Sequence, residues 1–247
     1  GTAGTGMADQ IHAAMMRSGL SAEEAKQRVW LVDISGLVSD DMKDAPDYQQ
    51  AYARHAAEVK DWSRRNGKID LLTVVQQVKP TILIGTSTDH GAFTQEVVEA
   101  LCAGVERPIV LPLSNPTERI EVMPADLVPW SKGRALIAVG IPVAPVEYEG
   151  VRYHIGQGNN ALLYPGLGLG VIVSGAKHVT DGMLLAAAEA VAGQVDVSAP
   201  GASLLPPVDN LRASSATVTV AVAKQAQGDG VGTIEHPKPN QAVKGAL

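Results

Sequence analysis

Residues 70–87, DLLTVVQQVKPTILIGTS, decide the fold of this chain. Asp70 is a typical N-cap for an amphipathic helix expected over residues 71–78, because its carboxylate accepts a free backbone N–H of the first turn. The apolar run TILIG at residues 81–85 then predicts a short buried strand. A short apolar strand beside an amphipathic helix is typical of proteins whose parallel sheet is covered by helices.

The same alternation continues on both sides of this stretch. Further helices are expected over residues 7–19, 21–28, 48–62, 94–105, 161–174, 180–191 and 210–227, and further strands over residues 29–33, 108–113 and 135–140. Residues 146–155 alternate in polarity around Glu149 and Gly150, which predicts a hairpin. This order predicts an α/β protein: a Rossmann-like, doubly wound, mainly parallel sheet with helices on both faces, plus C-terminal helices.

Composition narrows the classes of function. The 247 residues include 20 Lys and Arg against 26 Asp and Glu, a formal net charge of −6, which argues against nucleic acid or an anionic membrane as a partner. The single cysteine, Cys102, excludes an internal disulfide and a cysteine-based metal site. The longest apolar run, residues 161–173, contains Pro165 and is too short to span a bilayer. The pattern fits a cytoplasmic α/β enzyme.

The first residues, GTAGTGMADQ, are rich in glycine and precede the first expected helix. A dinucleotide fold places glycines where the chain turns and where backbone approaches a pyrophosphate, which rests on a helix N-terminus. We therefore predict cofactor contacts from Gly1, Thr2, Ala3 and Gly4, although a plain structural turn explains the glycines equally well on spacing alone. A glycine turn without a preceding strand also indicates the later part of a longer protein.

Asp33 ends the next expected strand, where a carboxylate is placed to accept both hydroxyls of an adenosine ribose. Its spacing of 29 residues from Gly4 exceeds the usual ~20, and the additional capped helix over residues 21–28 accounts for the excess. The alternative is an ordinary turn aspartate. Because no Arg or Lys directly follows Asp33, NAD is the expected cofactor; NADP is the alternative if Lys43 or Arg54 folds back onto a 2′-phosphate.

A glycine and two hydroxyl residues follow the strand at residues 81–85. Gly85, Thr86 and Ser87 are expected at the carboxyl edge of the sheet, where open α/β folds bind their ligands. We predict that they line the cofactor, and a tight turn between strand and loop is the alternative.

Asparagines form the second group of candidates. Asn115, in the sequence SNPT, is kept out of the helical region by Pro116, so its amide is expected to project at the sheet edge; a generic Asn-Pro turn would look similar. Asn159 and Asn160 precede an apolar helix. One of them is expected to cap that helix, which leaves the other to face a ligand.

Read together, these residues resemble the NAD-binding domain of the malic enzymes, in particular the bacterial branch that includes malolactic enzymes. The matching stretches run in family order through nearly the whole chain: GTAGTGMADQI, WLVDISGL, VKPTILIGTS, PLSNPT, VEYEGVRYHIGQGNNALLYPGLGLG and LPPVDNLR. The resemblance implies one NAD(P)-binding domain over residues 1–247 of a longer chain, whose first strand and N-terminal catalytic domain lie upstream. Residues 208–247 would be a C-terminal helix and a loose tail.

The resemblance implies an oxidoreductase that decarboxylates L-malate to pyruvate and CO₂ with NAD(P) and Mn²⁺ or Mg²⁺. In such enzymes the SNPT asparagine touches substrate and nicotinamide, which maps onto Asn115. The paired asparagines of the family line the same pocket, which maps onto Asn159 and Asn160 as substrate-binding residues, with Asn159 also at the cofactor. The family's lysine base, tyrosine acid and metal-binding carboxylates lie upstream, so no catalytic or metal-binding residue is expected here. The chain alone is therefore expected to be inactive.

Two alternatives stay open at this point. A malolactic enzyme would convert L-malate to L-lactate and CO₂ while retaining its NAD, and a non-catalytic nucleotide-binding module would need only the adenosine end of the site. The resemblance also implies a homodimer or homotetramer. One departure concerns the pocket: where the family reads Gly-Ser-Pro-Phe, this chain has Gly140, Ile141, Pro142 and Val143.

Overall fold

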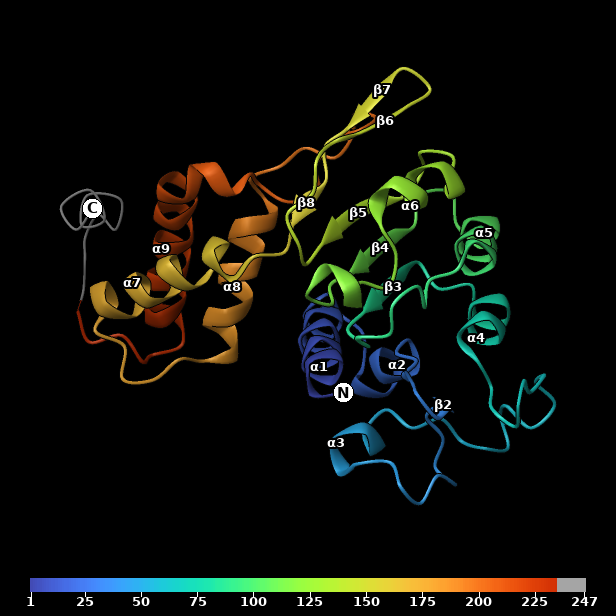
Figure 1. Ribbon diagram of the computed structural model, residues 1–247. Coiled ribbons are helices and arrows are strands. Elements are labelled where there is room, and N and C mark those ends of the chain that lie inside the picture. Colours follow the sequence, from blue (N-terminus) through green and yellow to red (C-terminus); the bar gives the residue numbers. More distant parts are fainter. Residues whose placement is uncertain (235–247) are drawn as a thin grey trace. The chain divides into compact units, whose positions relative to one another are not determined.

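The computed structural model describes residues 1–234, which divide into two compact units, Gly1–Leu136 (unit 1) and the residues from Ile137 onward (unit 2) (Figure 1). A single cofactor-binding domain over residues 1–247 stays a prediction. So does a C-terminal segment over residues 208–247, of which residues 235–247 lie outside the described part.

Unit 1 opens with helix α1 (Thr2–Arg17). The helical hydrogen-bond ladder begins at Gly1, whose carbonyl accepts from the backbone N–H of Thr5 at 3.2 Å. The expected glycine turn is therefore the first turn of the helix itself, and the predicted start at Met7 is wrong.

Helix α2 (Ala22–Gln27) carries the reciprocal cap that its sequence predicts. The backbone N–H of Ser21 donates to Glu24 Oε2 at 2.9 Å, and the backbone N–H of Glu24 donates to Ser21 Oγ at 3.3 Å. These two bonds satisfy donors that a helix start leaves without a partner.

The strand predicted over residues 29–33 is wrong in extent and in partner. Only β1 (Val32–Asp33) is extended, and it pairs antiparallel with β2 (Gly36–Leu37). Gly36 has φ +93°, and a Cβ there would lie 2.7 Å from the carbonyl oxygen of Ile69, so the tight reversal requires glycine. The preceding Trp30 stacks on another indole instead of joining a ladder.

The helix predicted over residues 48–62 is also wrong in extent. Helix α3 covers only Asp47–Gln50, and turns follow. The backbone of Arg54 exchanges hydrogen bonds with Val38 and Asp40, at 3.0 and 2.9 Å, so these backbone groups are not available to a helix.

The parallel pair β3 (Ile82–Gly85) and β4 (Ile109–Pro112) is the centre of unit 1, in the register Leu83 opposite Val110. Helix α4 (Leu71–Val78) precedes β3 and helix α5 (Gln95–Gly104) follows it, capped by Asp70 and Thr94. These elements confirm the sequence prediction. In Figure 1, α4 and α5 lie on one side of the two strands and α1 on the other.

Helix α6 (Pro124–Trp130) is a helix of unit 1 that the sequence analysis did not identify. It begins with Pro124, which suits a first helical turn because that position needs no N–H donor. Pro129 lies inside the short helix and masks its pattern. A single 3₁₀ turn, η1 (Thr117–Arg119), connects β4 to this region.

In unit 2, β5 (Leu136–Val139, beginning at the last residue of unit 1) pairs in parallel with β8 (Gly156–Gln157). Between them lies the predicted hairpin of β6 (Val146–Tyr148) and β7 (Val151–Tyr153). Glu149 and Gly150 both have positive φ, 48° and 76°, the conformation that a two-residue hairpin turn requires.

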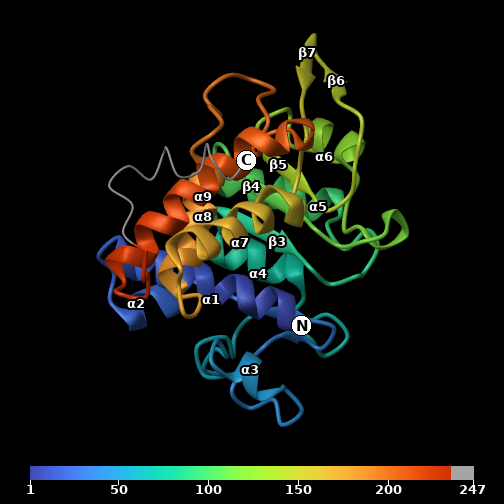
Figure 2. The ribbon, with the colours of Figure 1, turned by 90° about the vertical axis from the view of Figure 1, so that its left-hand side faces the viewer.

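Three α-helices of the described part of unit 2 lie side by side in Figure 2: α7 (Tyr164–Ser174), α8 (Asp181–Ala192) and α9 (Leu211–Gly228). Their buried core includes Met183, Val218 and Val222. All three were predicted, but α7 begins later than expected because the 3₁₀ turn η2 (Asn160–Leu162) precedes it. A second short turn, η3 (Val208–Asn210), leads into α9.

Parallel strand pairs flanked by helices confirm the predicted α/β class. Among residues 1–234, no helix is both long and apolar enough to cross a membrane.

Candidate functional site

The carboxyl ends of β3 and β4 carry the candidate site of unit 1. Because the strands are parallel, the loops that follow them leave the same edge of the sheet. The loops are bonded to each other: the backbone N–H of Thr88 donates to Ser114 Oγ at 2.9 Å. The predicted residues Gly85, Thr86 and Ser87 therefore lie beside the segment that carries Asn115.

A buried carboxylate, Glu121, lies under this edge and was not identified from the sequence. Its side chain is fully buried, and both neighbours, Ile120 and Val122, are buried too. Glu121 Oε1 accepts from the backbone N–H of Ser87 at 2.8 Å, from Ser87 Oγ at 2.9 Å and from Ser114 Oγ at 2.6 Å. Glu121 Oε2 accepts from the backbone N–H of Ser114 at 3.3 Å. One carboxylate thus joins the two loops.

Two glycines make room for close contacts at this edge. A Cβ at Gly85 would lie 2.5 Å from Glu121 Cδ, so a side chain there would displace the carboxylate. A Cβ at Gly4 would lie 2.9 Å from Thr86 Oγ1, so the first turn of α1 passes against the loop after β3. The structure therefore brings together two of the predicted groups, the glycines of α1 and the loop of Thr86.

Asp33 is held in one orientation at the end of β1. Its Oδ1 accepts from the backbone N–H of Ile34 at 2.7 Å, and its Oδ2 accepts from the side-chain amide of Gln49. The backbone nitrogen of Gly1 lies 3.4 Å from the same Oδ2. The hydrogen bond from Ile34, together with the amide of Gln49, lowers the pKa of Asp33 although partial burial opposes it. A partly exposed, ionised carboxylate thus faces the start of α1.

The segment that carries Gln49 is fastened to α1 by a second contact. The buried Tyr52 donates its hydroxyl to Asp9 Oδ1 at 2.7 Å, and the His12 ring meets the tyrosine ring edge-on. Burial and the adjacent carboxylate of Asp9 raise the pKa of Tyr52. Gln49 is itself buried, so its amide is fixed where Asp33 needs a donor.

Asn115 is exposed at the edge of unit 1, and its Nδ2 donates to the carbonyl of Leu113 at 3.2 Å. The exposed position agrees with the expectation that its amide projects from the edge. Its contact with a substrate remains a prediction.

The paired asparagines lie in unit 2, after β8. Asn159 Oδ1 accepts from the backbone N–H of Ala161 at 2.9 Å and so caps the turn η2. Asn160 is the exposed first residue of that turn. Asn159 therefore caps the 3₁₀ turn before α7 and not α7 itself, whose N-cap is Leu163, so the expected asparagine cap lies one turn earlier than predicted. Residues 140–143 differ from the family's Gly-Ser-Pro-Phe, and in this segment Ile141 is buried within unit 2.

Residues 1–234 contain no group of three or more His, Cys, Asp or Glu side chains placed to hold a metal ion. Residues 40–47 include four aspartates, and Asp40 accepts from His55 Nδ1 at 2.8 Å and from the backbone N–H of Ala56 at 2.9 Å. Cys102 is buried on α5, as expected for a core residue.

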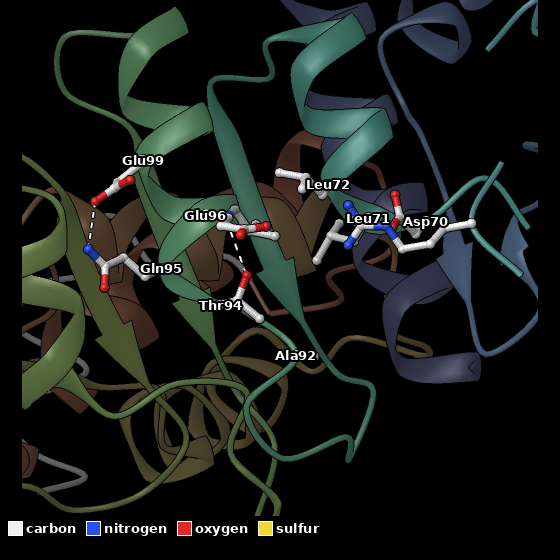
Figure 3. A pocket seen from close by; sticks show the side chains of 10 residues that line it. Asp70, Leu71, Leu72, Ala92, Thr94, Gln95, Glu96 and Glu99 are labelled. Atoms are coloured by element: carbon white, nitrogen blue, oxygen red, sulfur yellow. Dashed lines mark hydrogen bonds and ion pairs between the residues drawn. The ribbon is translucent and has the colours of Figure 1, made fainter. Parts of the chain in front are cut away.

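A shallow groove of about 620 Å³ lies at the starts of α4 and α5 (Figure 3). Its lining includes Arg65, Asp70 and Glu96, and Arg65 Nε lies 3.3 Å from Asp70 Oδ2. None of the predicted site residues lines this groove. The chemistry of the candidate site therefore lies outside it.

Comparison with known proteins assigns the chain to a family. The family described as "Malic enzyme, NAD binding domain" matches residues 1–227. The chain is 55% identical over 249 aligned residues to NAD-dependent malic enzyme 3 of Bacillus subtilis, covering 100% of this chain and 44% of that protein. It is 47% identical to the malolactic enzyme of Lactococcus lactis, covering 99% of this chain and 45% of that protein. The chain thus spans less than half the length of these relatives.

Solved structures are similar in fold. The malic enzyme of Entamoeba histolytica has a TM-score of 0.63 at 23% identity, over 88% of this chain and 40% of that chain. The malic enzyme of Pyrococcus horikoshii has a TM-score of 0.62 at 24% identity, over 85% of this chain and 42% of that chain. These similarities support the Rossmann-like fold.

Proposed function

This chain belongs to the malic enzyme family as its NAD-binding domain, and from that premise we propose that it holds NAD for the oxidative decarboxylation of L-malate to pyruvate and CO₂. The observation that carries the proposal is the family match over residues 1–227, combined with an edge of parallel strands where polar loops and a helix start converge. The reaction belongs to the full-length protein, because the chain spans under half of its relatives.

The donors and acceptors of unit 1 suit a dinucleotide. Helix α1 has neither a side-chain cap nor an acidic residue in its first turn, which leaves its free N–H groups and positive end for a pyrophosphate. The acceptor atoms of Asp33 suit the hydroxyls of the adenosine ribose. We assign pyrophosphate contacts to residues 1–4 and cofactor contacts to residues 85–87.

NAD is preferred over NADP because Arg54, one of the two cations considered for a 2′-phosphate, is committed elsewhere. Arg54 Nη2 lies 2.6 Å from Glu58 Oε1, and its guanidinium lies 4.0 Å above the ring of Trp30. Its Nη1 also donates to the carbonyl of Gln27 at 3.1 Å. Moving Arg54 onto a phosphate would break these contacts.

NAD supplies the hydride acceptor for oxidation at C2 of malate. The residues of this chain bind and orient. In unit 1, Asn115 is proposed to present its amide to the substrate and to the nicotinamide carboxamide. In unit 2, Asn159 and Asn160 are proposed as substrate-binding residues, and Asn159 also as a cofactor contact. An amide serves there without adding charge to the pocket. The divalent metal is proposed to be bound mainly by residues outside this chain, and the chain alone is proposed to be inactive.

The first test uses the full-length protein with L-malate, NAD⁺ and Mn²⁺ and quantifies NADH, pyruvate and lactate. Equal amounts of NADH and pyruvate are expected. Lactate without net NADH would instead establish the second candidate, a malolactic enzyme. The similarity to the malolactic enzyme of Lactococcus lactis is the reason for considering it. If neither pyruvate nor lactate forms, both candidate functions are contradicted. We further propose that the full-length protein is a homodimer or homotetramer, and sedimentation would measure this oligomeric state. We also propose that it is cytoplasmic.

A further inference from the structure

The fully buried carboxylate of Glu121 has a role that neither the family match nor the proposed contacts assign. We propose that Glu121 is a positioning residue for the nicotinamide half of the cofactor: it fixes the loops after β3 and β4 so that Ser87 and Asn115 meet the bound dinucleotide. This inference rests on the proposed function, because it names what orients that same site.

The hydrogen bonds converge on the carboxylate from both loops. Four donors reach it: a backbone N–H and a hydroxyl from Ser87, and the same two groups from Ser114. Each hydroxyl also accepts a backbone N–H, because Thr88 donates to Ser114 Oγ at 2.9 Å and Asp89 donates to Ser87 Oγ at 3.1 Å. The two serines therefore connect the backbone of both loops to the carboxylate of Glu121.

The network needs two acceptor oxygens at position 121. Each serine hydroxyl that accepts an N–H has one proton left to donate, and the Glu121 side chain offers an oxygen to both hydroxyls and to both backbone N–H groups. A glutamine at position 121 has the same size but turns one acceptor atom into a donor, which would face the N–H of Ser114. The substitution Glu121→Gln thus changes the hydrogen bonding with little change in volume.

Further contacts limit how the carboxylate sits. The carboxylate of Glu121 lies so close to Gly85 that a Cβ at position 85 would overlap it. The backbone N–H of Phe93 donates to the carbonyl of Glu121 at 3.1 Å. Glu121 is thus fixed through its main chain and its side chain, while Asn115, one residue beyond Ser114, stays exposed. The buried group positions the edge, and the exposed groups are left to touch the ligand.

The test measures two ligands on the full-length protein, by calorimetry, for the wild type and Glu121→Gln. ADP-ribose carries the adenosine and pyrophosphate of the cofactor, and NAD⁺ adds the nicotinamide. Losing hydrogen bonds to a charged group is expected to weaken NAD⁺ binding about tenfold and to leave ADP-ribose binding within about twofold. In the folded fraction the KM for NAD⁺ should rise and kcat should fall.

The matched control is Glu118→Gln, an exposed glutamate of the same loop whose side chain is not bonded to Ser87 or Ser114. It should bind both ligands as the wild type does. If Glu121→Gln does not fold, Ser87→Ala, Ser114→Ala and the double variant carry the test. Each single change should weaken NAD⁺ selectively, and the double variant should weaken it by less than the product of the two effects.

Equal weakening of NAD⁺ and ADP-ribose by Glu121→Gln, or unchanged NAD⁺ binding, would overturn the positioning role. If the effects of Ser87→Ala and Ser114→Ala on NAD⁺ binding were fully independent, the shared hydrogen-bond network would be contradicted. If the wild-type protein binds neither ligand, the proposed function itself fails, so the two failures are distinguishable.

Discussion

The edge of β3 and β4 and the helix pair α7 and α9 are held together in opposite ways. At the edge, two loops are joined by hydrogen bonds to the carboxylate of Glu121, and the groups proposed to touch the ligand remain exposed. Between α7 and α9, contact depends on the absence of side chains at Gly166 and Gly170. The difference separates two tasks: hydrogen bonds orient a site, and close packing stabilises a unit.

The helix contact in unit 2 leaves no space at its glycines. A Cβ at Gly166 would lie 2.5 Å from Val218 Cβ and 2.7 Å from the carbonyl oxygen of Ser215. Thr219 Oγ1 donates to that same carbonyl at 2.7 Å. Because backbone and a bonded side chain border the glycine, the neighbours cannot move aside at low cost.

The largest predicted effect is therefore on the stability of unit 2. Gly166→Ala should lower the free energy of unfolding by about 3 kcal/mol, because overpacking a tight contact moves backbone. Hydrogen exchange, measured residue by residue, should accelerate in α7 and α9 and stay unchanged in β3 and β4.

The matched control lies two residues further along the same helix. A Cβ at Gly168 would meet nothing within 4 Å, so Gly168→Ala should stabilise α7 by about 0.5–1 kcal/mol through helix propensity. Two alanine substitutions in one helix thus have opposite predicted signs. Equal effects would mean that packing against α9 does not govern this region.

The second predicted effect is on ligand binding in unit 1. Asp33→Asn removes the charge that two donors orient, and we expect NAD⁺ affinity to fall about tenfold, as for the loss of one good hydrogen bond to an ionised group. ADP-ribose should weaken equally, since both ligands carry the adenosine ribose. Asp61→Asn, an exposed aspartate elsewhere in unit 1, is the control. If Asp33→Asn weakened the binding of NAD⁺ and not that of ADP-ribose, the assignment of Asp33 to the adenosine ribose would be contradicted.

A smaller effect follows from the lowered pKa of Asp33. A carboxyl whose folded pKa lies below its unfolded value, about 4, stabilises the protein above that unfolded value and loses the contribution as the pH falls through the folded pKa. The stability difference between wild type and Asp33→Asn should therefore be largest near neutral pH and shrink below about pH 4. Urea unfolding at several pH values checks this, and a difference that grows on acidification would contradict the assigned direction.

The sequence predicted those features that depend on local patterns. Asp70, Thr94 and the apolar runs of β3 and β4 specify their elements within a few residues, and the structure confirms them. The hairpin of β1 and β2 was missed because its pairing depends on a return at Gly36, not on periodicity. Glu121 was missed because its partners lie 7 and 34 residues away along the chain. A charged residue between two apolar ones, in the sequence IEV, was the available signal.

The smallest predicted effect tests how far the positioning extends from the edge into the rest of unit 1. Tyr52→Phe removes the hydroxyl that bonds Asp9 and keeps the buried ring. The exposed carboxylate of Asp9 can bond water instead, so stability should fall by only about 0.5–1.5 kcal/mol. NAD⁺ affinity should change less than in Asp33→Asn, because Gln49 still donates to Asp33. If instead Tyr52→Phe weakened NAD⁺ as strongly as Asp33→Asn does, the orientation of Asp33 would depend on the whole segment, and packing and hydrogen bonding would not be separate tasks in unit 1.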